Sequence, residues 1–152
     1  MSSSLSKERF QDLVDAVWTM TLATSGEKGP WSAPVYYLYR EKNFYFFSSP
    51  SSRHIQEGEG RLCAASIFRD HDRVDRLEGL QMSGTIQLQK TGFRAASVAK
   101  AYALRFGIKV PGKDFAAFFQ NVFHACLYAF SADQVLYMDN RKGFGNREPL
   151  FL

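Results

Sequence analysis

The residues best suited to chemistry stand together at 48–54, where the chain reads S-S-P-S-S-R-H directly after the aromatic run 44–47. Aromatic runs are typical of buried strands, and the proline predicts a turn after this strand. Ser52 or the serine before it would cap a short helix that continues through Arg53 and His54. Serine hydroxyls, the start of a helix and two potential cations at one point are groups that bind phosphate. The alternative is an ordinary strand–turn–helix with solvated serines, and the segment by itself leaves both interpretations open.

Other catalytic and metal-binding patterns do not occur in the sequence. The three histidines, His54, His71 and His124, are not spaced with cysteines or carboxylates as a zinc site requires, so we expect no metal. The chain also lacks a nucleophile elbow, a P-loop and a dinucleotide-binding glycine motif. If the protein is an enzyme, a cofactor must therefore supply the reactive chemistry, and no catalytic residue can be assigned.

The composition is that of a single folded domain over residues 1–152. Hydrophobic residues make up 45% of the chain and aromatic residues 15%, which is enough for a core and favours β-rich packing. The net charge is +4, but the cations are scattered, so we expect no nucleic-acid partner. Cys63 and Cys126 lie in apolar runs and are interpreted as small buried residues in a reducing compartment. Because no apolar signal or spanning segment is present, we expect no membrane contact and a cytoplasmic location.

Hydrophobic periodicity predicts the elements that must position the segment 48–54. Residues 5–18 show one apolar helical face, and an alternating strand is predicted to start at Trp18. The strand 31–40 contains Pro34, which cannot donate to the ladder and places this strand at an edge or a bend. The other predicted elements are strands at 44–47, 61–68, 79–90 with a bulge at Gly84, 122–130 and 135–139, and helices at 91–106 and near 115–119. About six strands with peripheral helices predict an α+β fold, mainly antiparallel β, in the form of a barrel.

The charged run 69–76, R-D-H-D-R-V-D-R, falls between two of these strands. Alternating charges are typical of a solvated hairpin end, which is the interpretation we prefer. A loop that faces a substrate is the alternative.

Several segments together resemble the FMN-binding split-barrel superfamily, also called pyridoxamine 5′-phosphate oxidase-like. The resemblance rests on the helix–strand–hairpin opening, the strand ending F-F-S-S-P-S-S-R-H-I and the later strand G-L-Q-M-S-G. The segments A-Y-x-x-R-F and D-N-x-x-G-F-G are most similar to its YhbP-like branch. The resemblance covers nearly the whole chain and implies a six-stranded split β-barrel with peripheral helices.

This resemblance implies a homodimer that holds two FMN molecules at the subunit interface. It places Phe47 and Ser48 against the ribityl phosphate of the flavin. It matches Ser52, Arg53 and His54 to the family's phosphate-binding Ser-Arg-Lys. It also implies that the backbone of the strand around the following residues lies along the isoalloxazine ring: Ala33, Pro34 and Val35.

The chain departs from the family pattern at several positions. His54 replaces the usual lysine, so phosphate affinity is expected to be weaker or to depend on pH. Gly79 stands where the true oxidases have a flavin-contacting glutamine, and Gln81, which shares its strand face, is the candidate replacement. Asn140, Phe144 and Gly145 are expected to form the partner chain's wall of the flavin pocket. The alternative is that Gly143 and Gly145 only shape the turns of the tail. These departures weigh against oxidation of pyridoxamine phosphate but leave the flavin site in place.

The function expected from this resemblance is that of an FMN-dependent oxidoreductase. FMN would accept a hydride or electrons from a donor such as a nicotinamide nucleotide and pass them to a small acceptor. A non-catalytic flavin- or haem-binding dimer on the same barrel is the alternative. A third possibility is an interaction dimer that has lost its cofactor.

Overall fold

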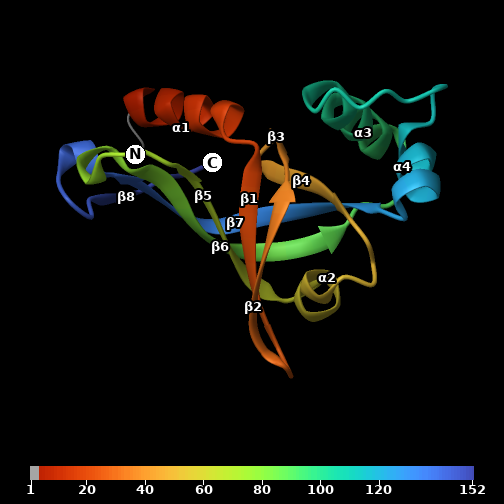
Figure 1. Cartoon of the computed structure of the whole chain (residues 1–152), viewed down its shortest axis with the longest axis horizontal. Helices are drawn as coiled ribbons and strands as arrows, with labels where there is room; N and C mark the ends of the chain where they lie inside the picture. Colours follow the sequence, from red (N-terminus) through yellow and green to blue (C-terminus); the bar gives the residue numbers. More distant parts are fainter. Residues whose placement is uncertain (1–3) are drawn as a thin grey trace.

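One antiparallel sheet curls into a half-open barrel, with helices around it, in the computed structural model, which describes residues 4–152 (Figure 1). In chain order the elements are α1 (Ser4–Ala16), β1 (Thr19–Gly26), β2 (Gly29–Tyr36), β3 (Leu38–Arg40), β4 (Asn43–Ser48), α2 (Arg53–Gly58), β5 (Leu62–Arg69), the 3₁₀ turn η1 (Val74–Arg76), β6 (Glu78–Leu88), α3 (Phe93–Arg105), α4 (Phe115–Phe123), β7 (Cys126–Asp139), the 3₁₀ turn η2 (Asn140–Lys142) and β8 (Arg147–Pro149). The predicted α+β class with mainly antiparallel strands is confirmed.

The strands are ordered β2-β1-β5-β6-β7-β4-β3, and the short β8 pairs with β7. β2 and β3 belong to one run of chain that bends at Tyr37, so that β2 pairs with β1 while β3 pairs with β4. The first and last strands of this order, β2 and β3, are therefore the two halves of one bent strand. The barrel is split at the bend between them. With β2 and β3 counted together, the sheet contains six long strands, in agreement with the predicted number of about six. Pro34 lies opposite Thr21 of β1 and, as predicted, on an edge strand, where its missing N–H leaves no gap in a second ladder.

The C-terminal part of the sheet differs from the prediction. The segments 122–130 and 135–139 do not form an antiparallel pair, because β7 runs without interruption over 14 residues. Its first half pairs with β4, and β6 pairs along most of its length. The predicted bulge is present at Gly84, but its extra residue lies on the partner strand: Ser83 and Gly84 pair with Gln134 and Ala132, which leaves Asp133 of β7 unpaired. A side chain at Gly84 would have its Cβ 2.1 Å from the carbonyl oxygen of Ser131, so only glycine allows the two strands to approach here.

β4 explains why four aromatic residues follow one another. Phe44 and Phe46 are fully buried inside the barrel, whereas Tyr45 and Phe47 face outward, where α3 and α4 cover them. Successive side chains of a strand point to opposite faces, so a strand that is covered on both sides is apolar at every position. Each fully buried side chain of this size stabilises the fold by about 1.5–3 kcal/mol.

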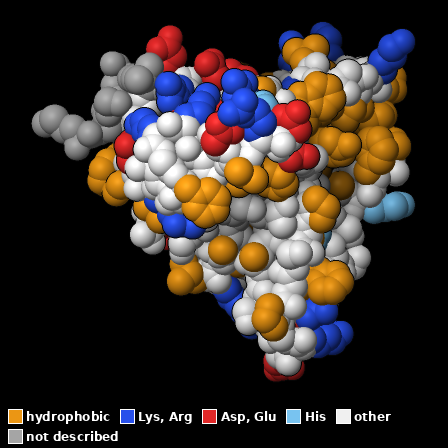
Figure 2. All heavy atoms as spheres, turned by 60° about the vertical axis from the view of Figure 1, so that its left-hand side comes forward, with side chains coloured by type: hydrophobic (Ala, Val, Ile, Leu, Met, Phe, Trp, Pro, Cys, Tyr) orange, Lys and Arg blue, Asp and Glu red, His pale blue; other side chains and the backbone are white. Residues whose placement is uncertain are grey.

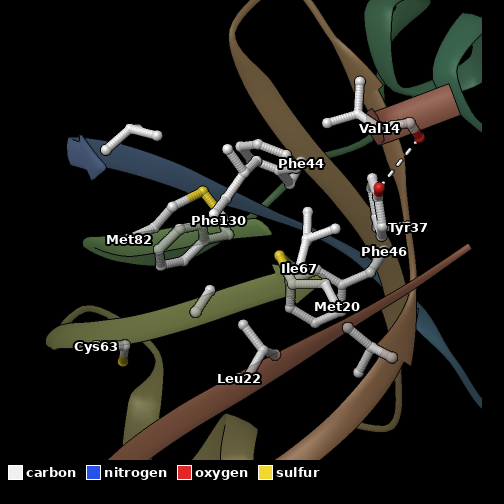
Figure 3. Packing of buried hydrophobic residues seen from close by; sticks show 14 of the residues in the cluster. Val14, Met20, Leu22, Tyr37, Phe44, Phe46, Cys63, Ile67, Met82 and Phe130 are labelled. Atoms are coloured by element: carbon white, nitrogen blue, oxygen red, sulfur yellow. Dashed lines mark hydrogen bonds between the residues drawn. The ribbon is translucent and has the colours of Figure 1, made fainter. Parts of the chain in front are cut away.

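The closed end of the barrel is fixed by Tyr37 at the bend of the β2–β3 strand. Its ring is fully buried, and its hydroxyl donates a hydrogen bond of 3.0 Å to the carbonyl oxygen of Val14 in α1 (Figure 3). Burial raises the pKa of this hydroxyl far above its ordinary value, so it remains a donor. The bond ties the last turn of α1 to the bend and satisfies a polar group that burial would otherwise leave unpaired.

The remaining helices cover the outside of the barrel at one end of β4 and β7. α3 packs Ala95 and Val98 on Tyr45, and α4 packs Phe119 on Phe47. The rings of this last pair are stacked with their centroids 3.8 Å apart. Within residues 4–152, no helix is both long and apolar enough to cross a membrane.

Candidate functional site

The segment 48–54 forms a tight turn between the end of β4 and the start of α2. β4 ends at Ser48, and Ser52 is the N-cap residue of α2. The predicted strand–turn–helix is therefore confirmed, but the hydroxyl of Ser52 does not cap the helix. It donates instead to the carbonyl oxygen of Ser49 at 2.7 Å, which closes the turn.

Three of the predicted phosphate-binding side chains meet inside this turn. The Oγ of Ser48 lies 2.7 Å from Nε2 of His54 and 3.1 Å from the Oγ of Ser52. The Oγ of Ser52 lies 3.4 Å from the same imidazole nitrogen. We call these three residues the α2-turn cluster. It joins two hydroxyls and one imidazole within hydrogen-bond reach of one another, as the sequence predicted.

The α2-turn cluster is uncharged near neutral pH. Burial lowers the pKa of His54 below its ordinary value of 6.5, because desolvation disfavours the imidazolium. The neutral imidazole can accept a hydrogen bond from a serine hydroxyl and donate none at the same nitrogen. The cluster therefore offers dipolar groups to a ligand but no permanent charge.

Arg53, the fourth predicted ligand, points to a different neighbour. Its Nε lies 3.0 Å from both carboxylate oxygens of Glu57, one helical turn on. Its Nη2 donates to the carbonyl oxygens of Lys28 and Gly29 in the β1–β2 hairpin, and its guanidinium lies 4.4 Å from the ring centre of Trp31. The structure thus places Arg53 on the adjacent side of α2, where its charge is already paired.

The strand residues expected along the flavin ring are divided between the two faces of β2. Ala33 and Val35 are buried and point into the barrel, while Pro34 is on the outer face. Of these three residues, only Pro34 has its side chain on the outer face. The ring of Phe47 is used in packing on Phe119, so its expected contact with a ribityl phosphate would fall to its backbone.

Gln81 and Gly79 occupy the outer face of β6. Gln81 is exposed, and its side-chain oxygen accepts a hydrogen bond of 3.0 Å from Nε of Arg147. At Gly79 a Cβ would lie 2.7 Å from the carbonyl oxygen of Ile67. The backbone of β5 therefore leaves no room for a side chain at this position.

The two tail residues predicted to cover a partner's flavin behave differently from each other. Asn140 is buried in its own chain, where its amide donates to the carbonyl oxygen of Val74 at 2.7 Å and its side-chain oxygen accepts from the N–H of Gly145 at 3.0 Å. Both ends of this side chain are therefore bonded within its own chain, to η1 and to the turn that follows η2. Phe144 is 87% exposed and is free to contact another molecule.

The sequence analysis missed a neighbour of the α2-turn cluster. Cys126 at the start of β7 is the register partner of Ser48 and is only partly buried. Its thiol lies 3.1 Å from the side-chain oxygen of Gln120. The antiparallel pairing of β4 with β7 is the signal that would have found it, but that pairing joins segments far apart in the chain.

A second polar group that the sequence did not predict lies at another end of the barrel, beside η1 and η2. Two buried carboxylates, Glu78 and Asp139, are surrounded by Arg9, Arg69 and Arg141. We call these five residues the arginine–carboxylate cluster. Within residues 4–152, no group of three or more His, Cys, Asp or Glu side chains is placed to hold a metal ion.

Asp139 is the most tightly held member of this cluster. It is 1% exposed, and its oxygens lie 2.7 Å from both Arg9 Nη1 and Arg141 Nε. Burial alone would raise the pKa of Asp139, but the hydrogen bonds and charge of Arg141, together with the charge of Arg9, bring it below its ordinary value. Glu78 accepts a hydrogen bond from the buried hydroxyl of Tyr137, whose pKa is raised by burial and by this bond.

Comparison with known proteins gives structural matches only. No family model matches the chain, and no significant match is found among curated proteins. The fold is similar to that of Campylobacter jejuni ChuZ (TM-score 0.75, 12% identity), over 99% of this chain and 61% of that protein, so the chain spans less than two thirds of ChuZ. It is also similar to HutZ, the heme storage protein of Vibrio cholerae (TM-score 0.69, 14% identity, 85% of this chain and 92% of that one).

The FAD-binding protein of Mycobacterium smegmatis is a third structure with this fold. It has a TM-score of 0.63 and 11% identity, and the match covers 86% of this chain and 93% of that one. Identities this low establish the arrangement of elements alone. The chain therefore has a split-barrel fold, as these proteins have.

Proposed function

We propose that this protein is an FMN-dependent oxidoreductase that binds the flavin phosphate at the α2 turn. The observation that carries the proposal is the α2-turn cluster, in which Ser48, Ser52 and His54 converge within 3.4 Å of one another at the end of a split-barrel strand. The expected ring-binding strand lies on the same barrel with only its backbone and Pro34 facing outward. Similar structures include a protein described as FAD-binding, which supports a flavin on this fold.

The donors present fit a phosphate in type but supply little charge. The two hydroxyls can donate to phosphate oxygens, and the imidazole nitrogen that faces them can donate once His54 is protonated. The positive charge must come from Arg53, which is paired with Glu57, or from protonation of His54, whose pKa is lowered. We therefore expect modest affinity at neutral pH and tighter binding in mildly acidic solution. To bind the phosphate, Arg53 would have to exchange its contacts with Glu57 and the β1–β2 hairpin for the ligand.

We further propose that the protein works as a homodimer through the outer face of the sheet. Three large apolar side chains on the outer face of β2 and β5 are exposed to solvent: Tyr36 (55%), Leu62 (73%) and Phe68 (53%). Figure 2 shows hydrophobic side chains spread over the surface below a charged upper region. Scattered apolar residues are normal on a monomer, but several large ones on one sheet face are typical of an interface. Phe144 would then be free to lie against the partner.

When bound, FMN would supply the transfer of a hydride or electrons from a donor such as a nicotinamide nucleotide. The chain's own contribution would be to position the cofactor: Ser48, Ser52, His54 and Arg53 at the phosphate, and the β2 backbone beside Pro34 at the ring. The apolar surroundings would exclude water from the ring. No side chain in the described residues is assigned a role in proton transfer.

The visible absorption spectrum of the purified protein, recorded during titration with FMN, tests this proposal. We expect a saturable change in the flavin bands in wild type and a loss of affinity of about tenfold in Arg53→Ala, since one charge-assisted hydrogen bond is worth about 1.5–3 kcal/mol. Arg40→Ala, at an exposed arginine on β3, is the matched control and should bind as wild type does. Absence of any flavin signal from folded dimer would overturn the proposal.

A haem-binding role on the same barrel is the second candidate. The supporting observation is His124, which is exposed at the end of α4 beside Phe123 and Val122, each 53% exposed. An accessible imidazole beside apolar surface suits a haem ligand. A Soret band that forms on titration with haemin and is lost in His124→Ala would favour this role over flavin.

A further inference from the structure

A cavity of about 470 Å³ opens beside the arginine–carboxylate cluster, away from the α2 turn. Its lining comes from the end of β5, the charged loop with η1, the start of β6 and η2. In Figure 1 this region lies near β8 on the left, whereas α2 lies at the bottom of the barrel. In Figure 2 acidic and basic side chains gather over the upper part of this face.

The cavity is rigidly built, because buried carboxylates fix its arginines. Arg141 reaches Asp139 through Nε at 2.7 Å and through Nη2 at 3.1 Å, and its Nη2 lies 3.3 Å from Glu78. Arg69 donates from Nη2 to the carbonyl oxygen of Asp12 at 3.3 Å, and its Nη1 lies 3.9 Å from Glu78. These contacts hold two guanidinium groups at the wall before any ligand arrives.

The hydrogen-bond acceptors that line the cavity already have partners within the chain, whereas several N–H donors do not. Glu78 is engaged by Tyr137, Arg141 and Arg69. The carboxylate of Asp75 receives two hydrogen bonds from Arg73, at 2.9 and 2.6 Å. Both ends of the side-chain amide of Asn140 are bonded within the chain, as described above.

The spare donors belong to the arginines of the wall. A guanidinium carries five N–H donors and no acceptor. Among residues 4–152, the guanidinium of Arg76 makes no hydrogen bond and acts only through its charge on Asp75, and Nη1 of Arg141 and Nε of Arg69 also donate no hydrogen bond. The hydrogen-bonding capacity left at the cavity is therefore almost entirely that of a donor.

We propose that this cavity binds a small oxyanion, the carboxylate or phosphate group of a small molecule, through Arg76, Arg141 and Arg69. Such groups accept hydrogen bonds and donate none, and planar guanidinium groups bind them in bidentate fashion. The site is separate from the α2 turn and does not depend on flavin binding. It gives the loop 69–76 the ligand-facing role that the sequence left as an alternative.

The test is a titration of the full chain with inorganic phosphate, and separately with acetate, at constant ionic strength against sodium chloride. The two probes distinguish a phosphate ligand from a carboxylate ligand. Backbone amide signals in ¹H–¹⁵N spectra report where the anion binds. We expect saturable shifts confined to residues 69–78 and 139–142 with at least one of the two anions.

Two exposed substitutions on η1 should change the affinity in opposite directions. Arg76→Gln removes an unpaired cation and should weaken binding by about fivefold or more. Asp75→Asn removes a negative charge from the wall and frees Arg73, so it should strengthen binding. Arg40→Gln, far from the cavity, is the control and should bind as wild type does.

Three outcomes would overturn the proposal: no saturable shift with either anion, equal affinities in all three variants, or shifts confined to residues 48–57. The last result would place the anion at the α2 turn instead. Loss of binding in Arg76→Gln with unchanged FMN titration would confirm the oxyanion site whatever the outcome for the flavin.

Discussion

The α2-turn cluster and the arginine–carboxylate cluster are both partly buried and polar, but only the second is made of charges. The first joins Ser48, Ser52 and His54, whose lowered pKa keeps the imidazole neutral. The second surrounds Asp139 and Glu78 with guanidinium groups. In both clusters the buried polar groups have partners. In the α2-turn cluster these are neutral hydrogen bonds between residues close in sequence, and in the arginine–carboxylate cluster they include ion pairs between residues far apart in sequence.

This difference determines whether a substitution in a cluster changes mainly ligand binding or mainly the stability of the fold. A neutral cluster loses little if a ligand displaces one of its hydrogen bonds, so it can exchange partners. A buried carboxylate cannot lose its counterions without leaving an unpaired charge in a medium of low dielectric constant. We therefore expect substitutions in the arginine–carboxylate cluster to act mainly on folding, and those in the α2-turn cluster to act mainly on the ligand.

The largest effect is expected from Asp139→Ala. Its removal leaves Arg9 and Arg141 without their shared partner and should lower the free energy of unfolding by about 3 kcal/mol, the range seen when one member of a buried ion pair is deleted. Ser52→Ala, the matched change in the other cluster, should cost about 1 kcal/mol, since it removes neutral hydrogen bonds. Urea denaturation monitored by circular dichroism measures both. Equal losses in the two variants would contradict the distinction.

A smaller effect, on ligand affinity, is expected from His54→Lys. Lysine carries at neutral pH the charge that His54 lacks, so FMN should bind about tenfold more tightly than to wild type at about pH 7.5. Wild type should gain affinity as the pH falls through the lowered pKa of His54, whereas the lysine variant should not show this additional gain. Fluorescence quenching of FMN follows both. If the variant bound no more tightly, the phosphate would lie elsewhere.

The smallest effect is the dependence of stability on pH. His54 has a folded-state pKa below 6.5, so its contribution is complete above pH 6.5 and is lost as the pH falls from there toward the folded value. Asp139 has a folded-state pKa below 3.8, so its contribution is complete above about pH 3.8 and is lost as the pH falls through the folded value. The unfolding free energy should therefore fall in two separate pH windows. His54→Asn should remove the first decrease only, and a single decrease in wild type would contradict this assignment.

Local features of the fold were predictable because their causes are local. The aromatic run 44–47 required a strand covered on both faces, and the proline in S-S-P-S-S required the turn that follows. Pro34 predicted the edge strand for a similarly local reason, because proline has no N–H to donate to a ladder. The polar residues around Ser131 led to the wrong prediction of a hairpin between two short strands. Such residues inside a long strand resemble a hairpin turn unless the pairing with β6 is known.

The candidate site was predictable in part. Ser48, Ser52 and His54 come together because they are only four and six residues apart on one turn. The pairing of Arg53 with Glu57 has the spacing of a helical salt bridge, but its bonds to the β1–β2 hairpin bridge 24 and 25 residues. The arginine–carboxylate cluster joins Arg9 to Asp139 across 130 residues, and no periodicity in one sequence reports such a contact.

The most direct test of the central claim, that the α2 turn holds a flavin phosphate, compares FMN with riboflavin. The two ligands differ only in the phosphate, so the ratio of their dissociation constants measures its contribution. We predict that wild type binds FMN at least about tenfold more tightly, and that Ser48→Ala and Arg53→Ala reduce this ratio. Ser49→Ala, at a neighbouring half-buried serine whose hydroxyl bonds to Ser51, should leave it unchanged. Equal affinity for the two flavins, or a ratio that none of these substitutions alters, would contradict the account.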